Sequence, residues 1–292
     1  MILEKAYAKL NLFLDVENKR PNGYHGIVSL MQTVDWCDNI YMQKNVSGEI
    51  TISADSCNVP SGRDNVAYRA AESYLKAAAA SGGVDIRIEK SIPVAAGMAG
   101  GSADAAAVLR GMNRLYDNRL SISELLELGK SIGADVPFCL LGGTKLARGI
   151  GEELSDCDHG FPDCVIVCAK LGEGISTPEA YRLLDEKHDN FRARRIRAED
   201  LQTLLDGMKQ NDAVSASRGF FNVFEEVIGA LRPSVEIAKK VLLENGAFAA
   251  MMSGSGPSVF GLFRKEVEAE VAVQALISKG AQAKVCRPIP HV

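Results

Sequence analysis

The segment from Pro93 to Ala107 carries the clearest chemistry in the sequence, because a glycine-rich loop runs directly into an alanine-rich helix. Its residues are PVAAGMAGGSADAAA, and they follow a predicted strand. Glycines let the backbone turn back and expose several N–H groups, and a helix N-terminus adds about half a positive charge. Such a loop is suited to a phosphate, although it is neither a Walker loop nor a Rossmann fingerprint. The structural alternative is a turn that lets the helix pack tightly.

Two charged residues lie in otherwise apolar surroundings. Lys9 belongs to the apolar stretch 8–12, and Asp135 stands between a predicted helix end and Pro137. Taken singly, Lys9 fits an edge lysine with its ammonium group in water, and Asp135 fits the N-cap of a helix that begins near Pro137. A buried lysine is costly without a partner, so pairing would explain both residues. A carboxylate held by an ammonium group stays ionised and can accept a proton from a substrate hydroxyl.

Three further segments offer binding chemistry, each with a simpler explanation. Residues 22–25 (NGYH) place an aromatic ring and an imidazole beside a turn, and most such segments are only turns. Residues 252–257 (MSGSGP) offer backbone N–H groups to a second phosphate or simply close a hairpin. The arginines at 192, 194, 195 and 197 are followed directly by Glu199 and Asp200. We expect that basic cluster to be a solvated surface.

The elements that must position these segments alternate between strand and helix patterns without a regular βαβ rhythm, which predicts an α+β fold. Strands are predicted over 10–16, 27–34, 39–44, 84–89, 164–169, 247–252, 258–263 and 282–286. Helices are predicted over 65–80, 102–116, 121–132, 178–187, 198–210, 220–230, 235–245 and 266–278. A polar interruption at 152–163 predicts a boundary between domains 1–155 and 156–292.

The composition excludes several classes of protein. The 292 residues are 47% hydrophobic with a net charge of −4, so neither a disordered chain nor a nucleic-acid-binding field is expected. The longest apolar stretch, 247–263, is interrupted by polar residues, whereas a membrane span needs about 20 apolar residues. The first residues show no signal-peptide core. The seven scattered cysteines form no C-x-x-C pair, which favours free thiols in the cytoplasm over a zinc site or disulfides.

Together these motifs resemble the superfamily of galactokinase, homoserine kinase, mevalonate kinase and phosphomevalonate kinase, the GHMP kinases. The three motifs of the superfamily occur in order, at 8–12 (AKLNL), 93–107 and 253–257 (SGSGP). Further segments are similar to the members that phosphorylate a cytidine-diphosphate-linked polyol: 20–25 (RPNGYH), 133–138 (GADVPF), 143–149 (GTKLARG) and 176–178 (STP). The similarity extends over nearly the whole chain.

The resemblance implies a two-domain α+β GHMP kinase fold with the active site in the cleft between the domains. It also implies ATP-dependent phosphorylation of the 2-hydroxyl of the methylerythritol unit of the substrate. The implied cofactors are ATP and Mg²⁺, with the metal held mainly through ATP phosphates and water rather than by protein ligands. One departure bears on the metal, because Ala103 follows Ser102 where the family usually has a second serine. The implied partners are two small molecules, with no nucleic acid and no membrane.

The resemblance assigns roles to single residues. Asp135 would accept the proton of the acceptor hydroxyl, and Lys9 would hold Asp135 and stabilise developing charge. Tyr24 and Tyr181 would sandwich the cytosine while His25 reads its hydrogen-bonding edge. The implied ATP contacts are Pro93, Ala95, Ala96, Gly97, Met98, Ala99, Gly100, Gly101 and Ser102, with Asn65 and Asn113 near the adenosine. The other implied acceptor contacts are Asn11, Thr177, Gly254 and Ser255.

Two alternatives stay open at this point. Another kinase of the superfamily, acting on homoserine or a mevalonate, would share the glycine-rich loop but would not need Tyr24, His25 and Tyr181. A nucleotide-binding module without catalytic activity would need the loop but not the pairing of Lys9 with Asp135.

Overall fold

Two sheets organise the chain in the computed structural model, which describes residues 1–20, 23–56, 59–188 and 196–292. The larger sheet has the strand order β3 (Ile50–Ala54), β4 (Gly83–Glu89), β2 (His25–Asn45), β1 (Ile2–Lys19), β8 (Phe221–Asn222). Outside this order, β5 (Thr144–Arg148) pairs with β2 and with β6 (Glu153–Asp156). The smaller sheet has the order β11 (Gln282–Cys286), β7 (Val165–Lys170), β10 (Val259–Phe263), β9 (Ala249–Met252). The mixture of sheets and helices confirms the predicted α+β class.

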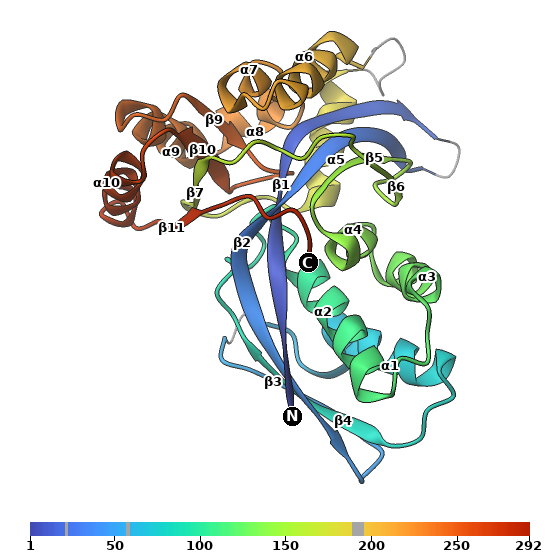
Figure 1. Cartoon of the computed structure of the whole chain (residues 1–292). Helices are drawn as coiled ribbons and strands as arrows, with labels where there is room; N and C mark the ends of the chain where they lie inside the picture. The colour runs from blue at the N-terminus through green and yellow to red at the C-terminus, as the bar shows by residue number, and fades with distance from the viewer. Residues whose placement is uncertain (21–22, 57–58, 189–195) are drawn as a thin grey trace.

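The strands β1 and β2 are long and pair antiparallel, running from the lower part of the molecule into the upper part (Figure 1). The sequence patterns predicted three shorter strands in this region. Residues 8–16 are buried without interruption, because both faces of β1 are covered there. A strand buried on both faces loses its alternation of apolar and polar residues, so its true length was not visible in the pattern.

The lower part packs helices on the larger sheet (Figure 1). These helices are α1 (Val66–Ala77), α2 (Gly100–Leu115), α3 (Ile122–Ile132) and α4 (Val136–Leu141), with a short 3₁₀ turn, η1, at Gly62–Asp64. The alanines of α1 and α2 form a core with apolar residues of β2 and β4. Small side chains allow the two helices to approach closely. The N-terminal end of α2 lies near the middle of the molecule (Figure 1). The short α4 was not among the predicted helices, although the N-cap alternative for Asp135 placed the start of a helix near Pro137.

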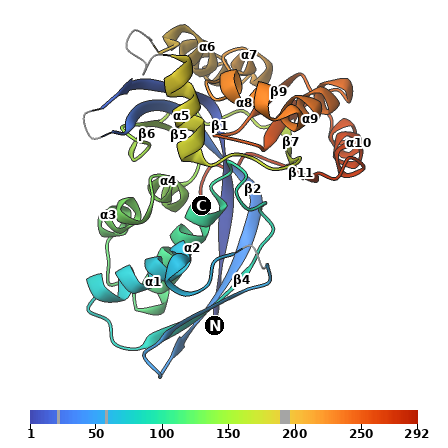
Figure 2. The ribbon, with the colours of Figure 1, turned by 180° about the vertical axis from the view of Figure 1, so that it is seen from behind.

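The upper part surrounds the smaller sheet with α5 (Thr177–Lys187), α6 (Ala198–Lys209), α7 (Ala213–Ser217), α8 (Glu225–Leu231), α9 (Pro233–Glu244) and α10 (Glu266–Ile277). The hairpin predicted over 247–263 is confirmed, since β9 and β10 pair antiparallel. The helix predicted over 220–230 was wrong at its start, because Phe221 and Asn222 pair with β1 as strand β8 and α8 begins only at Glu225. Figure 2 shows α5 running down from α6 toward α4.

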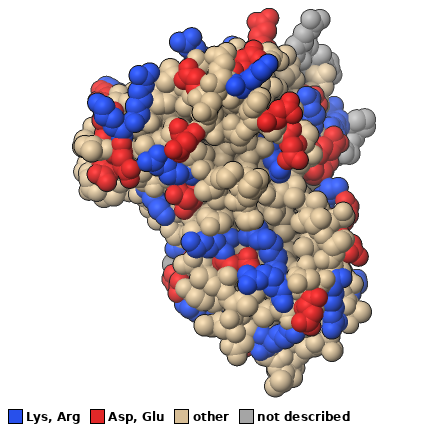
Figure 3. Space-filling view, viewed as in Figure 1, with Lys and Arg blue, Asp and Glu red and all other residues tan. Residues whose placement is uncertain are grey.

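The structure also bears on the expectations about surface charge, membrane spans and cysteines. Basic and acidic side chains lie close to one another across the face shown in Figure 3. No helix among the described residues is long and apolar enough to cross a membrane. All the described cysteines are free thiols, and Cys57 lies outside the described residues. The arginines at 192, 194 and 195 also lie outside them.

Candidate active site

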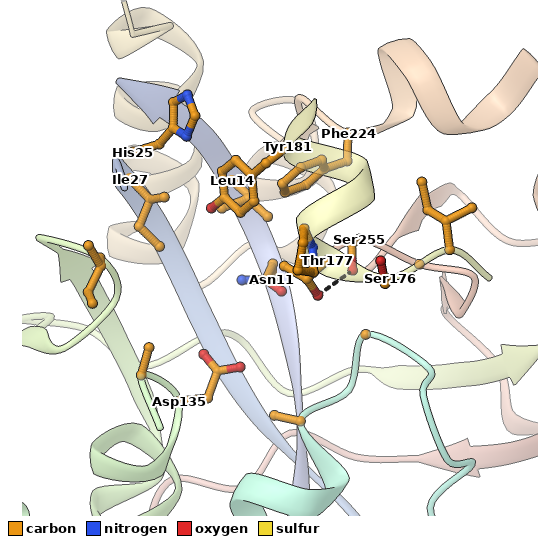
Figure 4. A pocket seen from close by; sticks show the side chains of 18 of the residues that line it. Asn11, Leu14, His25, Ile27, Asp135, Ser176, Thr177, Tyr181, Phe224 and Ser255 are labelled. Carbon is orange, nitrogen blue, oxygen red and sulfur yellow. Dashed lines mark hydrogen bonds between the residues drawn. The ribbon is translucent and has the colours of Figure 1, made fainter. Parts of the chain in front are cut away.

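A cavity of about 890 Å³ lies where β1, the glycine-rich loop, α4, α5 and the β9–β10 turn meet (Figure 4). Most of the residues predicted to bind or catalyse line it together: Lys9, Asn11, Tyr24, His25, Ala95, Ala96, Gly97, Ala99, Gly100, Gly101, Ser102, Asp135, Thr177, Tyr181, Gly254 and Ser255. Segments more than 200 residues apart in sequence therefore contribute to one site.

The remaining predicted residues lie elsewhere. Asn65 and Pro93 line a smaller cavity of about 140 Å³, which the glycine-rich loop also borders through Ala95, Gly100 and Gly101. Met98 is buried, and its carbonyl oxygen accepts a hydrogen bond from the Lys9 N–H at 3.1 Å. Asn113 is brought to neither cavity, because its amide bonds the Tyr74 hydroxyl and both backbone groups of Leu120.

Lys9 and Asp135 face one another inside the larger cavity. The Lys9 Nζ lies 3.8 Å from Asp135 Oδ2 and donates to Asn11 Oδ1 at 2.6 Å. Asn11 in turn donates from Nδ2 to the Ser29 hydroxyl at 2.8 Å, so its amide is fixed and orients the lysine. Register shifts in β1 flank both Lys9 and Asn11. Lys9 and Asn11 are two residues apart in the regular stretch between these shifts, and side chains alternate between the faces of a strand, so both lie on the same side of the strand pair.

Asp135 occupies the N-cap position of α4, as its structural alternative predicted, but its side chain makes no capping hydrogen bond. Figure 4 shows the carboxylate pointing into the cavity instead. The side chain is 36% exposed, whereas that of Lys9 is 6% exposed. A carboxylate that is open to the cavity and close to a buried ammonium group has the placement of a general base.

The glycine-rich loop holds an unusual backbone conformation. Gly97 has a φ of 76°, and a Cβ placed there would lie 2.2 Å from the carbonyl oxygen of Ser253. Ala95 and Ala99 also have positive φ, which costs an alanine about 1–2 kcal/mol. Strain of this kind is typical of functional loops. Ala99 is the N-cap of α2, so the loop ends at the unpaired N–H groups of a helix N-terminus.

The β9–β10 turn joins the two sides of the site. The Ser253 hydroxyl donates to the carbonyl oxygen of Gly97 at 3.1 Å and accepts from the Asn11 N–H at 3.2 Å. The hydroxyls of Thr177 and Ser255 lie 3.1 Å apart, as the dashed line in Figure 4 marks. One turn therefore contacts β1, the glycine-rich loop and the start of α5. Gly254 and Ser255 are among the predicted acceptor contacts, whereas the fully buried Ser253 is not.

Aromatic rings form the upper end of the cavity. The His25 and Tyr181 rings are stacked, with centroids 5.0 Å apart and planes 12° from parallel. Phe224 meets Tyr181 edge to face at 5.1 Å, while Tyr24 lies exposed at the rim. Burial raises the pKa of the Tyr181 hydroxyl, so the phenol stays neutral. Phe224 and Asp185 also line this end, and neither was predicted because neither belongs to a recognisable motif.

A buried ionic cluster anchors the chain that enters the glycine-rich loop. Lys90 Nζ contacts Asp38 and lies 2.8 Å from Asp104 Oδ2. Asp38 also accepts the N–H groups of Ser91 and Ile92 at 2.6 and 2.8 Å. Two carboxyls thus share one ammonium group, and Asp104 is the one with an oxygen that has no hydrogen-bond partner. Burial raises the pKa of Asp104 to about 7.

This raised pKa predicts a pH-dependent stability. Because the folded protein binds the Asp104 proton more tightly than the unfolded chain, the stabilisation is complete below about pH 4 and is lost as the pH rises through about 7. Asp104→Asn should remove this dependence. Between pH 5.5 and pH 8 the free energy of unfolding of the wild type should fall by about 2 kcal/mol relative to the variant.

Urea unfolding of both proteins at the two pH values measures the difference. Asp206→Asn, at an exposed position of α6, is the control and should follow the wild type. Parallel pH profiles for wild type and Asp104→Asn would show that Asp104 is not the group that holds the proton.

Comparison with known proteins places the chain in a family. Residues 65–143 match the GHMP kinases N terminal domain, and residues 175–282 match the GHMP kinases C terminal domain. The 4-diphosphocytidyl-2-C-methyl-D-erythritol kinase of Bacillus velezensis is 44% identical over 91% of this chain and 89% of its own length. The protein of the same name from Clostridioides difficile is 40% identical over 96% of this chain and 93% of its own length.

Solved structures agree with this placement. A crystal structure of 4-(cytidine 5'-diphospho)-2C-methyl-D-erythritol kinase matches with a TM-score of 0.81 and 32% identity, covering 98% of this chain and 99% of the other. Homoserine kinase from Cytophaga hutchinsonii shares the fold, with a TM-score of 0.73 at 20% identity over 99% of this chain and 95% of its own. The chain therefore belongs to the GHMP kinase family, among the 4-diphosphocytidyl-2-C-methyl-D-erythritol kinases.

Proposed function

We propose that this enzyme transfers the γ-phosphoryl group of ATP to the 2-hydroxyl of 4-diphosphocytidyl-2-C-methyl-D-erythritol, a step of the non-mevalonate route to isoprenoid precursors. One observation carries the proposal: the Lys9–Asp135 pair, the glycine-rich loop and the His25–Tyr181 stack open onto the same cavity. A kinase needs a base, a phosphate site and a recognition site for the rest of the acceptor within reach of each other.

In the proposed mechanism Asp135 accepts the proton of the acceptor hydroxyl. The Lys9 ammonium group, held by Asn11, lies beside this carboxylate and stabilises the charge that develops on the oxygens. The N–H groups at the start of α2, at Gly100, Gly101 and Ser102, offer hydrogen bonds to the transferring phosphates. Most of the acceleration then comes from positioning and electrostatics, as phosphoryl transfer demands.

Mg²⁺ would supply charge neutralisation between the phosphates. In the part of the chain that the structure describes, no three His, Cys, Asp or Glu side chains come together as a metal site. Ser102 and Asp135 carry oxygens and line the larger cavity beside the phosphate loop, whereas Ala103 offers none. Two other oxygen-bearing side chains near the loop already have partners: the Ser253 hydroxyl donates to the Gly97 carbonyl, and Asp104 is paired with Lys90. This sparse set fits a cation that keeps most of its ligands from ATP phosphates and water.

The acceptor would occupy the upper end of the cavity. We propose that Tyr24 and Tyr181 hold the cytosine between them and that His25 reads its edge, with Thr177, Gly254 and Ser255 beside the diphosphate. Asn65 and Pro93 line the smaller cavity next to the glycine-rich loop, which supports an adenosine site there. The free thiols of the described cysteines favour a reducing compartment, and we propose the cytoplasm.

An ATP-consumption assay with three acceptors tests the proposal. We expect turnover with 4-diphosphocytidyl-2-C-methyl-D-erythritol and none with homoserine or mevalonate, because the latter two have no base for the His25–Tyr181 end of the cavity. Turnover with homoserine or mevalonate alone would reassign the acceptor within the superfamily. Absence of turnover with all three, in a protein that binds ATP, would favour a nucleotide-binding module.

A further inference from the structure

We propose that Asp185 is a positioning residue for base selection, which fixes the hydrogen-bonding polarity of His25 and thereby lets the cavity distinguish cytosine from uracil. The inference rests on the proposed function, in which His25 reads the edge of the base. Asp185 was not among the residues selected from the sequence. It lies on α5, 160 positions from His25 in the chain, and lines the same cavity.

The contacts of Asp185 make it a hydrogen-bond acceptor toward the imidazole of His25. Its Oδ1 lies 2.7 Å from His25 Nε2, and its Oδ2 lies 2.7 Å from Lys19 Nζ. An ammonium group can only donate, so Oδ2 accepts from Lys19, and the adjacent positive charge favours the carboxylate form, which can only accept at Oδ1 as well. The hydrogen of the bond to His25 is therefore on Nε2. The side chains of His25 and Asp185 are 4% and 13% exposed, so water competes little for this bond.

The same helix fixes the plane of the ring. Tyr181 precedes Asp185 by four residues on α5, which places both side chains on one face of the helix. Tyr181 stacks on the imidazole at 12° from parallel, and Phe224 supports Tyr181 from its edge. Tyr181 thus sets the plane of the imidazole, and Asp185 sets its rotation within that plane and the nitrogen that carries the hydrogen.

This arrangement matters because cytosine and uracil offer opposite patterns of hydrogen-bond donors and acceptors to a side chain that contacts their edge. Cytosine has an acceptor at N3 and an amino donor at C4, whereas uracil has an N–H donor at N3 and a carbonyl acceptor at C4. An imidazole that can turn over or change tautomer can satisfy either base. One that is held in a single tautomer and orientation rejects the base of the wrong polarity, because the mismatch leaves buried polar groups unpaired.

Asp185→Asn tests the inference, since the amide has the same shape but can both donate and accept. Calorimetric binding of CDP and of UDP gives the base preference directly, without turnover. We expect the ratio of the two affinities to fall by about tenfold or more in the variant, while the KM for ATP stays unchanged. The ¹⁵N chemical shifts of His25 should show hydrogen on Nε2 in the wild type and a mixture of tautomers in the variant.

Glu186→Gln is the matched control, because it removes the same charge from the next residue of α5, where the side chain is 60% exposed. It should keep the wild-type preference and tautomer. If the wild type turns over the cytidine acceptor and Asp185→Asn keeps the full CDP preference, the role of Asp185 is wrong while the proposed function stands. If the wild type does not turn over that acceptor, the proposed function itself fails. Melting temperatures of the three proteins show whether any loss reflects unfolding instead.

Discussion

Asp135→Asn is expected to lower kcat by about a hundredfold or more while leaving the affinity for ATP nearly unchanged. The amide keeps the shape of the side chain but cannot accept a proton at neutral pH. The Asp135 carboxylate stands 3.8 Å from Lys9 and points into the cavity without capping α4, so its replacement should disturb little of the fold. Steady-state kinetics with the acceptor varied at saturating ATP, and then the reverse, separate the two effects.

The matched control for this experiment is Asp117→Asn, at an exposed position after α2 and away from both cavities. It should behave as the wild type in both kcat and KM. A loss of less than about tenfold in Asp135→Asn would mean that the base has been misassigned. In that case the hydroxyl would have to lose its proton to another group, and Lys9 would act on the phosphates alone.

The parts of the site that depend on local backbone chemistry could be predicted from the sequence. The glycine-rich loop had to turn sharply before a helix, and the hairpin around 253–257 had to close, since glycine and proline dictate such geometry locally. Lys9 and Asp135 were recognisable because a charge in an apolar stretch needs an explanation, and their proximity confirms that reasoning. The role of Asn11 as the partner of Lys9 was not predicted, although residues two apart in a strand project from the same face and can therefore meet.

Contacts between distant segments were the ones that sequence analysis missed. The Lys90–Asp38 pair spans 52 positions and the His25–Asp185 pair spans 160, so no local periodicity connects either pair. The strand β8 has two residues, too few for any pattern, yet it brings Asn222 under the β9–β10 turn. Sequence patterns report which faces of an element are apolar, whereas polar contacts across such separations follow from the topology.

Gly97→Ala is expected to destabilise the protein by about 2–5 kcal/mol and to raise the KM for ATP by about tenfold or more. Two costs add at this position. The backbone φ of 76° is strained for alanine, and the new Cβ would lie 2.2 Å from the Ser253 carbonyl oxygen. That carbonyl belongs to the turn that also carries Gly254 and Ser255, so relieving the clash must displace the phosphate loop, the turn or both.

Gly62→Ala separates these two costs. Gly62 also has a positive φ, 57°, but a Cβ there meets nothing within 4 Å, so only the backbone strain of about 1–2 kcal/mol applies. Urea unfolding of the two variants therefore isolates the contact between the loop and the turn. Equal losses in Gly62→Ala and Gly97→Ala would mean that the turn moves aside freely and is not what holds the phosphate loop. A larger loss in Gly97→Ala, together with the raised KM for ATP, would establish that the two glycine-rich segments act as one rigid unit. Both variants add a methyl group, but only the one at position 97 reaches the turn.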